Sequence, residues 1–241
     1  LGGSVITRKE KPLTPNASAM RRLAREISEA AVPPLLLVHG GGSFGLPLAK
    51  QYSLKKGYRN ASQFLGFSKT HQAMVALNTM VVDALIQRNI PAVGLQPSSC
   101  VITKSGRIHI IEGKPLKKLL ESGFVPVLYG DTVIDMDLGF TILSGDQLAA
   151  HLAVLLNAER VIMGIDEDGL YSGDPKVDSS ASLISHATLQ ELKSMQQAFA
   201  KAKTSDVTGG MLGKMVELMP AVERGVSALI VNAAKANNVY K

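Results

Sequence analysis

Residues 35–45 of the chain read Leu35-Leu36-Leu37-Val38-His39-Gly40-Gly41-Gly42-Ser43-Phe44-Gly45. A short apolar run that enters a glycine cluster is typical of a buried parallel strand that ends in a tight turn. A helix is predicted directly after the cluster. Strand, glycine loop and helix in this order indicate an α/β protein whose ligand site lies at the carboxyl ends of the strands.

The same alternation continues on both sides of this stretch. Thr14 and Pro15 have the types expected for an N-cap and a first helical residue. Leu1 to Thr7 resembles a strand end that runs into a glycine turn. We predict helices over residues 16–31, 61–88 (broken near Gly66), 114–122, 146–157, 189–202 and 212–223. We predict strands over 35–38, 91–95, 124–128, 160–164 and 228–232, and hairpins around 104–106 and 137–139.

The composition bounds the class of protein. With 241 residues, 46% hydrophobic and 19% charged, the chain can bury a large core and is not a disordered protein. We predict no membrane segment, because no apolar run approaches the roughly 18 residues that span a bilayer. Cys100 is the one cysteine, which excludes an internal disulfide framework and a cysteine-based zinc cluster and favours a cytoplasmic location.

The charge is mildly basic, with 26 Lys and Arg against 20 Asp and Glu. The basic residues are scattered, only 5% of residues are aromatic and tryptophan is absent, so we expect no nucleic-acid partner. A solvated basic surface and a phosphorylated ligand both remain compatible with this charge.

Glycine recurs in four segments that follow predicted strands. Glycine lets the backbone approach an anion, and a helix N-terminus adds free N–H donors and partial positive charge. One such loop is most often only a turn, but four in an α/β pattern predict a site for two phosphate groups. The segments are Gly2 to Ser4, His39 to Gly45, Ser144 to Asp146 and Thr208 to Lys214.

Other phosphate and metal motifs do not fit. Residues 40–45 can be aligned with a dinucleotide fingerprint, but the acidic residue expected about 20 residues later is missing. Lys214 is followed by Met215, which excludes a Walker motif. Residues 165–176 lack the ligand spacing of an EF-hand and favour either a nucleotide-binding loop or an exposed loop with Asx turns.

Two lysines accompany the glycine segments. Lys9 follows the first glycine turn, and Lys214 opens a late helix. A lysine beside a transferred phosphoryl group neutralises its growing charge, whereas an arbitrary lysine is usually only a surface residue.

Taken together, these segments resemble the amino acid kinase superfamily and, within it, the archaeal-type isopentenyl phosphate kinases. The resemblance covers the whole chain in the family's order. It is carried by residues 1–7, 38–45, Tyr129-Gly130-Asp131, Ser144-Gly145-Asp146-Gln147, 166–171 and 206–214.

The resemblance implies an open αβα sandwich with a central, mainly parallel sheet. It implies one domain over residues 1–241, with an acceptor-binding part at about 1–145 and a nucleotide-binding part at about 146–241. It also implies transfer of phosphate from ATP with Mg²⁺ to isopentenyl phosphate, and a homodimer. A small phosphate monoester is the expected partner, and no strong base is needed, because its oxygen is already anionic at neutral pH.

Site residues follow from the resemblance position by position. Lys9 would bridge donor and acceptor phosphates, Lys214 would contact the nucleotide, and Asp146 would orient the lysines or a magnesium ion; we expect no metal site built from protein ligands alone. The implied nucleotide contacts are Gly2, Gly3, Ser4, Gly42, Asp166, Tyr171, Gly210 and Lys214. The implied acceptor contacts are Gly41, Gly45, Leu46 and Gly145.

One departure concerns Leu46. The family has a histidine there that hydrogen-bonds the substrate phosphate, and leucine can neither donate a hydrogen bond nor carry charge. The loss would cost about 1.5–3 kcal/mol, or one to two decades in rate. A natural variant, an engineered substitution and a weakened enzyme all fit this residue. The family's first motif also begins with a lysine before Leu1, which is absent here and is expected to have been trimmed.

Rival functions stay open at this level. Another kinase of the superfamily, of the fosfomycin or carboxylate type, is one; a nucleotide-binding protein without catalysis is another. The apolar stretch from Gln63 to Val82 favours an alkyl chain over an amino acid as ligand. Phe64, Phe67, Met74, Val75 and Met80 are either the walls of that slot or ordinary helix core.

Overall fold

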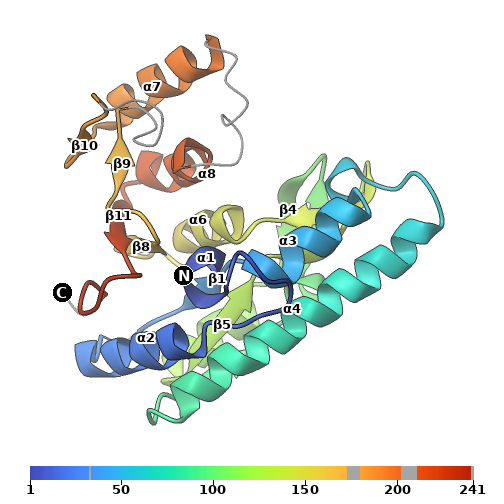
Figure 1. Ribbon diagram of the computed structural model, residues 1–241, viewed down its shortest axis with the longest axis horizontal. Coiled ribbons are helices and arrows are strands. Elements are labelled where there is room, and N and C mark those ends of the chain that lie inside the picture. Colours follow the sequence, from blue (N-terminus) through green and yellow to red (C-terminus); the bar gives the residue numbers. More distant parts are fainter. Residues whose placement is uncertain (33, 173–179, 202–210, 240–241) are drawn as a thin grey trace.

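The computed structural model describes residues 1–32, 34–172, 180–201 and 211–239. It is a layered α/β structure with helices on both faces of parallel strands (Figure 1). The helices are α1 Gly3–Ile6, α2 Ala17–Ala30, α3 Gly42–Gln51, α4 Ser62–Ile86, α5 Lys114–Glu121, α6 Gly145–Leu155, α7 Leu189–Lys201 and α8 Met211–Glu223, with short 3-10 turns η1 Leu54–Lys56 and η2 Pro97–Ser99.

The strands form four hydrogen-bonded groups. The parallel group β1-β5-β2 lies at the centre, β8 and β11 pair in parallel beside it, β4-β3-β6-β7 carries both hairpins, and β9 pairs with β10. Their bounds are β1 Leu37–His39, β2 Ala92–Gly94, β3 Val101–Lys104, β4 Arg107–Ile111, β5 Val125–Tyr129, β6 Asp131–Asp135, β7 Gly139–Leu143, β8 Arg160–Ile165, β9 Leu170–Tyr171, β10 Leu183–Ile184 and β11 Ser227–Asn232.

The backbone at Leu1 and Gly2 joins the two parallel groups. The nitrogen of Leu1 donates to the carbonyl of Val38 at 2.6 Å, and Gly40 N donates back to Leu1 O at 2.9 Å. On the other side, Gly2 N donates to Gly164 O in β8 at 2.6 Å. Leu1 is therefore paired as the predicted strand end would be. The glycine turn predicted after it forms the short helix α1.

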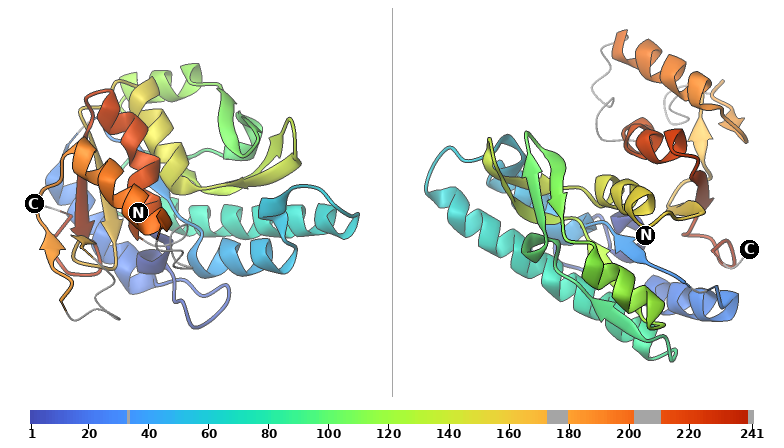
Figure 2. Two further views of the ribbon diagram at one scale, coloured as in Figure 1. Left: turned by 90° about the horizontal axis from the view of Figure 1, so that it is seen from above. Right: turned by 180° about the vertical axis from the view of Figure 1, so that it is seen from behind.

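Each face of the central strands has its own core. Leu37, Val127 and Tyr129 pack against α2 and α4, whereas Val38 and Leu128 pack against α5 and α6. A third core joins α6, α7 and α8 to β8 and β11. Figure 2 shows α2 and α4 on one side of the strands and α6 and α8 on the other, which confirms the predicted αβα sandwich.

Most predicted elements are present, with ends shifted by one or two residues, but two details are wrong. The N-cap of α2 is Asn16, whose side chain accepts from Ala19 N at 3.4 Å. Thr14 and Pro15 do not start the helix, because Pro15 forms a bridge with Thr7. The expected break in α4 is also absent.

Gly66 lies within the continuous helix α4 for a packing reason. A Cβ added there would meet the ring of Tyr52 at 2.3 Å. The glycine therefore provides room for the tyrosine ring and does not end the helix.

The contact between the first two glycine segments leaves no room for side chains. A Cβ on Gly3 would lie 2.2 Å from Gly42 N, and a Cβ on Gly42 would lie 2.1 Å from Thr7 Oγ1. Gly42 also has φ +46°, in the left-handed region. Glycine is thus required at both positions by the close approach of two backbones.

We predict that Gly42→Ala destabilises the fold by about 3 kcal/mol or more, from left-handed strain plus overpacking against backbone. Gly123→Ala is the matched control, because Gly123 has φ +85° and no atom within 4 Å of an added Cβ. The control should lose only about 1 kcal/mol. Urea unfolding of both variants measures the difference; equal losses would contradict the steric argument.

Candidate active site

Three of the glycine segments meet at the carboxyl ends of the parallel strands. Gly3 touches Gly42, and a Cβ on Gly145 would lie 3.1 Å from the carbonyl oxygen of His39. Ser144 caps α6, and its side chain accepts from Gln147 N at 3.1 Å. The N-termini of α3 and α6 therefore start beside each other, as an anion site at this edge requires.

Lys9 is paired with a carboxylate that lies 157 positions further along the chain. Its Nζ lies 2.6 Å from Asp166 Oδ2, and Ser4 Oγ donates to Asp166 Oδ1 at 2.6 Å. Burial opposes ionisation of Asp166, but the hydrogen bonds from Lys9 and Ser4 outweigh it and hold the pKa of that carboxyl below its usual range. Three predicted site residues are thus brought together.

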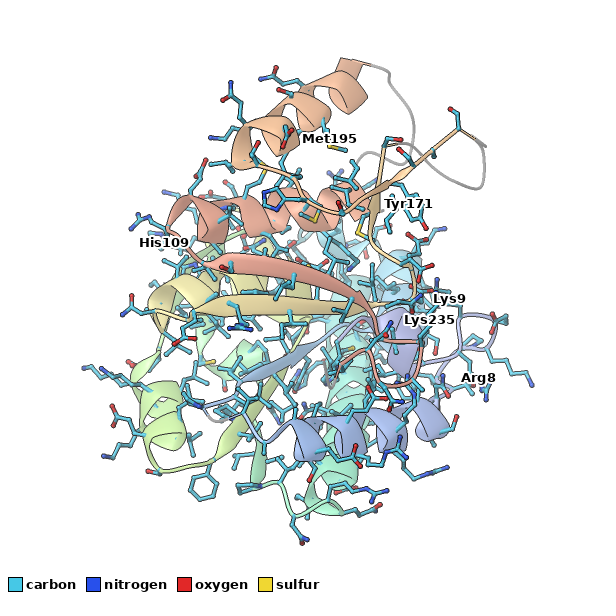
Figure 3. The ribbon with its side chains drawn as sticks, turned by 90° about the vertical axis from the view of Figure 1, so that its left-hand side faces the viewer. Arg8, Lys9, His109, Tyr171, Met195 and Lys235 are labelled. Atoms are coloured by element: carbon cyan, nitrogen blue, oxygen red, sulfur yellow. The ribbon has the colours of Figure 1, made fainter. Side chains whose placement is uncertain are left out.

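Figure 3 shows Lys9, Tyr171 and Lys235 on one side of the molecule. Lys235 Nζ lies 2.5 Å from Asp168 Oδ1, so Asp166 and Asp168 each bind a lysine. Tyr171 is partly buried in β9 and pairs in register with Leu183. This edge is where the nucleotide contacts were expected.

Lys214 forms the second lysine–carboxylate pair. Its Nζ lies 2.8 Å and 3.1 Å from the two oxygens of Asp146, which lies in the first turn of α6. Both side chains are about 28–29% exposed. Asp146 therefore contacts one of the two lysines that it was predicted to orient. Gly210 lies outside the described residues.

The predicted acceptor residues have different surroundings. Gly41 and Gly45 face Met74 of α4, with added Cβ atoms at 3.1 Å and 2.8 Å from its sulfur. Leu46 is 66% exposed on α3. His71, which is distant in sequence, pairs with the buried Asp131 at 3.0 Å.

The apolar residues of α4 divide into two sets. Met74 is buried and Val75 packs against the same core, whereas Phe64 is 57% exposed and Met80 is 38% exposed. Phe64 and Phe67 form an aromatic cluster with two residues that the sequence did not indicate, Tyr58 and Phe140. Of the residues expected to wall an alkyl slot, Phe64 is therefore exposed beside its aromatic cluster, whereas Met74 and Val75 belong to the helix core.

A cavity of about 350 Å³ lies beside the Asp146–Lys214 pair. The β3–β4 and β6–β7 hairpins, η1, α6 and α8 enclose it. Most of its residues were not predicted as site residues. They are Lys55, Ser105, Gly106, Arg107, Leu138, Thr141, Ile142, Ser144, Asp146, Gln147, Gly213, Lys214 and Glu217.

One buried carboxylate holds both hairpin turns of this cavity. Asp135 accepts from the backbone nitrogens of Ser105 and Gly106 in one turn and of Asp137 and Leu138 in the other, at 2.8–3.2 Å. Burial alone would raise its pKa, but these hydrogen bonds lower the pKa of Asp135 to about 2. Asp135 therefore fixes the two hairpin tips relative to each other.

The hairpin β3–β4 is also tied to the helices. Gln147 of α6 accepts from Ile108 N at 2.8 Å and donates to Gly106 O at 3.1 Å. Arg107 donates two hydrogen bonds of 2.8 Å to Glu217 of α8. The Arg107–Glu217 pair thus bridges the hairpin and the helix that carries Lys214.

His39 is the buried histidine behind the second glycine loop. Nδ1 must donate to the carbonyl of Gly40 at 3.1 Å, so Nε2 accepts from Asn78 Nδ2 at 3.2 Å. The ring stacks on Tyr129 with centroids 5.4 Å apart. Burial lowers the pKa of His39 to about 4, and the neutral ring is the form that fits both hydrogen bonds.

The carboxylates suit a magnesium ion that arrives with phosphates. Among the described residues, no group of three or more His, Cys, Asp or Glu side chains could hold a metal. Mg²⁺ usually takes one or two carboxylates together with substrate phosphates and water. Asp146 is a partly exposed carboxylate within the third glycine segment and fits that role.

In the described parts of the chain, no helix is long and apolar enough to cross a bilayer.

Comparison with known proteins agrees with this geometry. The model of the amino acid kinase family matches residues 1–232. The chain belongs to the amino acid kinase family. Among curated family members, the isopentenyl phosphate kinase of Methanothermobacter thermautotrophicus is 41% identical, over 100% of this chain and 92% of its own. That of Methanocaldococcus jannaschii is 34% identical with the same coverage.

Solved structures of this family have the same fold as the chain. A structure titled as isopentenyl phosphate kinase has a TM-score of 0.87 at 38% identity and covers all of this chain and 92% of its own. UMP kinase from Ureaplasma parvum has a TM-score of 0.63 at 17% identity, which shows the shared fold alone.

We predict that His39 makes stability depend on pH. Because its folded pKa of about 4 lies below the ordinary 6.5, the unfolded chain takes up the proton first as pH falls. The stabilisation is fully present above about pH 6.5 and is lost toward pH 4, in total about 3 kcal/mol. Urea unfolding at pH 7 and pH 5 should therefore show a loss of about 2 kcal/mol from this group.

The control is His39→Gln, whose neutral amide can donate to Gly40 and accept from Asn78. Its stability should fall less between pH 7 and pH 5 than that of the unaltered protein. The same pH dependence in both proteins would assign the effect to other groups, such as His151, whose pKa burial also lowers.

Proposed function

We propose that this protein transfers the γ-phosphoryl group of ATP to isopentenyl phosphate and so forms isopentenyl diphosphate. The observation that carries the proposal is the pair of lysine–carboxylate contacts at the meeting point of the glycine segments, Lys9–Asp166 and Lys214–Asp146. The names of the full-length relatives support the same acceptor.

The roles follow from the chemistry of the reaction. An oxygen of the acceptor phosphate attacks the γ-phosphorus, and the bond to the leaving ADP oxygen breaks. The attacking oxygen is already anionic, so the enzyme must position the groups and neutralise charge. We assign the neutralising role to Lys9 and Lys214; magnesium on the ATP phosphates would add to it.

The remaining assignments are part of this proposal. Backbone N–H groups at Gly2, Gly3, Ser4 and Gly42 would contact the ATP phosphates, and Asp166, Tyr171 and Gly210 would lie on the nucleotide side. Gly41, Gly45, Leu46 and Gly145 would lie on the acceptor side. The alkyl tail would pack against the exposed face of Phe64 in its aromatic cluster. Residues 1–145 and 146–241 would then be the acceptor and nucleotide parts of one domain.

A coupled ADP-release assay tests the reaction. We expect ADP release that depends on isopentenyl phosphate and is absent with the unphosphorylated alcohol. Leu46→His should raise kcat/KM roughly ten- to a hundredfold, by adding a charged hydrogen bond at the acceptor. Lys9→Met should abolish turnover without unfolding the protein, because Lys9 is largely exposed.

Each other outcome has a definite meaning. Turnover in Leu46→His alone would identify a disabled or retuned kinase. ATP binding without turnover in either protein would reject isopentenyl phosphate and favour another acceptor of the family, a phosphonate or a carboxylate.

We also propose that the protein is a homodimer. Ile110, Ile102 and Ile134 are direct neighbours across β4, β3 and β6 and therefore share one face. They are 50%, 37% and 53% exposed, and a contiguous apolar row of this kind marks an interface. Light scattering should give twice the 25.6 kDa of the chain. Ile134→Glu should lower that mass, and a monomer at all concentrations would reject the dimer.

A further inference from the structure

Among the residues that the structure describes, Lys55 is the basic side chain of the cavity without a carboxylate partner. Three basic side chains line this space: Lys55, Arg107 and Lys214. Arg107 is paired with Glu217 and Lys214 with Asp146. Within the described parts of the chain, the amine of Lys55 has neither an ion pair nor a hydrogen bond. The lining therefore carries three positive and two negative side chains, an excess that favours an anionic ligand.

The backbone of Lys55 is held firmly against the hairpins. Leu54, beside it in η1, is fully buried. Thr141 Oγ1 donates to Lys55 O at 3.5 Å, and Tyr58 N donates to Leu138 O at 2.8 Å. A Cβ on Gly57 would meet Leu138 at 2.8 Å, so η1 lies directly on the β6–β7 hairpin. The unpaired amine thus starts from a fixed point on the cavity wall.

We propose that Lys55 binds the phosphate of the acceptor and selects for phosphorylated acceptors, an inference that rests on the proposed function. The cavity adjoins Lys214, which is assigned to the transfer itself. Leu46 is not among the cavity residues and cannot supply a charged hydrogen bond. A lysine ammonium contacting a phosphate oxygen provides such a bond, and an uncharged alcohol would not gain from it.

The position of Lys55 favours the acceptor over ATP. It lies between α3 and α4, in the part of the chain assigned to the acceptor, and faces the two hairpins. Gly145, which is assigned to the acceptor side, lies between the cavity residues Ser144 and Asp146. Lys9, Asp166 and Tyr171 of the nucleotide side are not among the cavity residues, whereas Lys214, which serves the transfer, is. Loss of the Lys55 amine should therefore weaken the acceptor and spare ATP.

The chain offers a matched control in the next residue. Lys56 is an exposed lysine of the same 3-10 turn that does not line the cavity. We expect Lys55→Ala to raise the KM for isopentenyl phosphate roughly ten- to a hundredfold, with the KM for ATP unchanged. Lys56→Ala should leave both constants unchanged, and Lys55→Arg should restore most of the acceptor affinity.

Equal acceptor KM values in Lys55→Ala and Lys56→Ala would overturn the inference, as would an increase in the KM for ATP alone. Calorimetric binding of inorganic phosphate separates this failure from failure of the proposed function. If the unaltered protein does not phosphorylate isopentenyl phosphate, the function fails. Weaker phosphate binding by Lys55→Ala than by Lys56→Ala would still support the cation site. Equal binding, or none to the unaltered protein, would reject it.

Discussion

The backbones of Gly3 and Gly42 are in direct contact, and the positions of the other site residues follow from this contact. Two turns from different strands approach so closely that neither tolerates a Cβ. This contact places α1 against the start of α3, and the hydrogen bonds of Leu1 and Gly2 tie both turns to β1 and β8. The central parallel strands can therefore end together at one edge, where N–H groups are free for an anion.

Around this rigid centre the charged groups are arranged as pairs. Lys9 and Lys214 each have a carboxylate partner, Asp166 and Asp146, supplied by a different strand or helix end. In each pair, the carboxylate holds the flexible lysine side chain in one orientation before a phosphate binds. The carboxylate also neutralises the charge of the lysine when no phosphate is bound.

Local patterns predicted the helices, the strands and the phosphate-binding loops, because hydrophobic periodicity and glycine clusters are features of short stretches of sequence. The glycine segments, Lys9 and Lys214 were found in this way, whereas the role of Asp146 came from the family resemblance. The structure brings the described members of this set to one edge. The N-cap Asn16 was missed because Thr14 and Pro15 have the same residue types, and a bridge from Thr7 decides between them. Contacts such as Arg107–Glu217 join residues 110 positions apart, and no local pattern records them.

The shared carboxylate of Asp135 also determines which parts of the cavity wall are joined by buried hydrogen bonds. Asp135 holds both hairpin turns and Gln147 ties one of them to α6, so the hairpins and α6 form one connected wall of the cavity. The opposite wall is α8, which packs on α6 in a shared apolar core and is joined to it by the Lys214–Asp146 pair. Its link to the β3–β4 hairpin is the Arg107–Glu217 pair, whose arginine is largely exposed, and exposed pairs contribute about 1 kcal/mol or less. Salt therefore weakens the link between the hairpin and α8 at the rim of the cavity, whereas the buried hydrogen bonds of Asp135 and the α6–α8 core are much less sensitive to ionic strength.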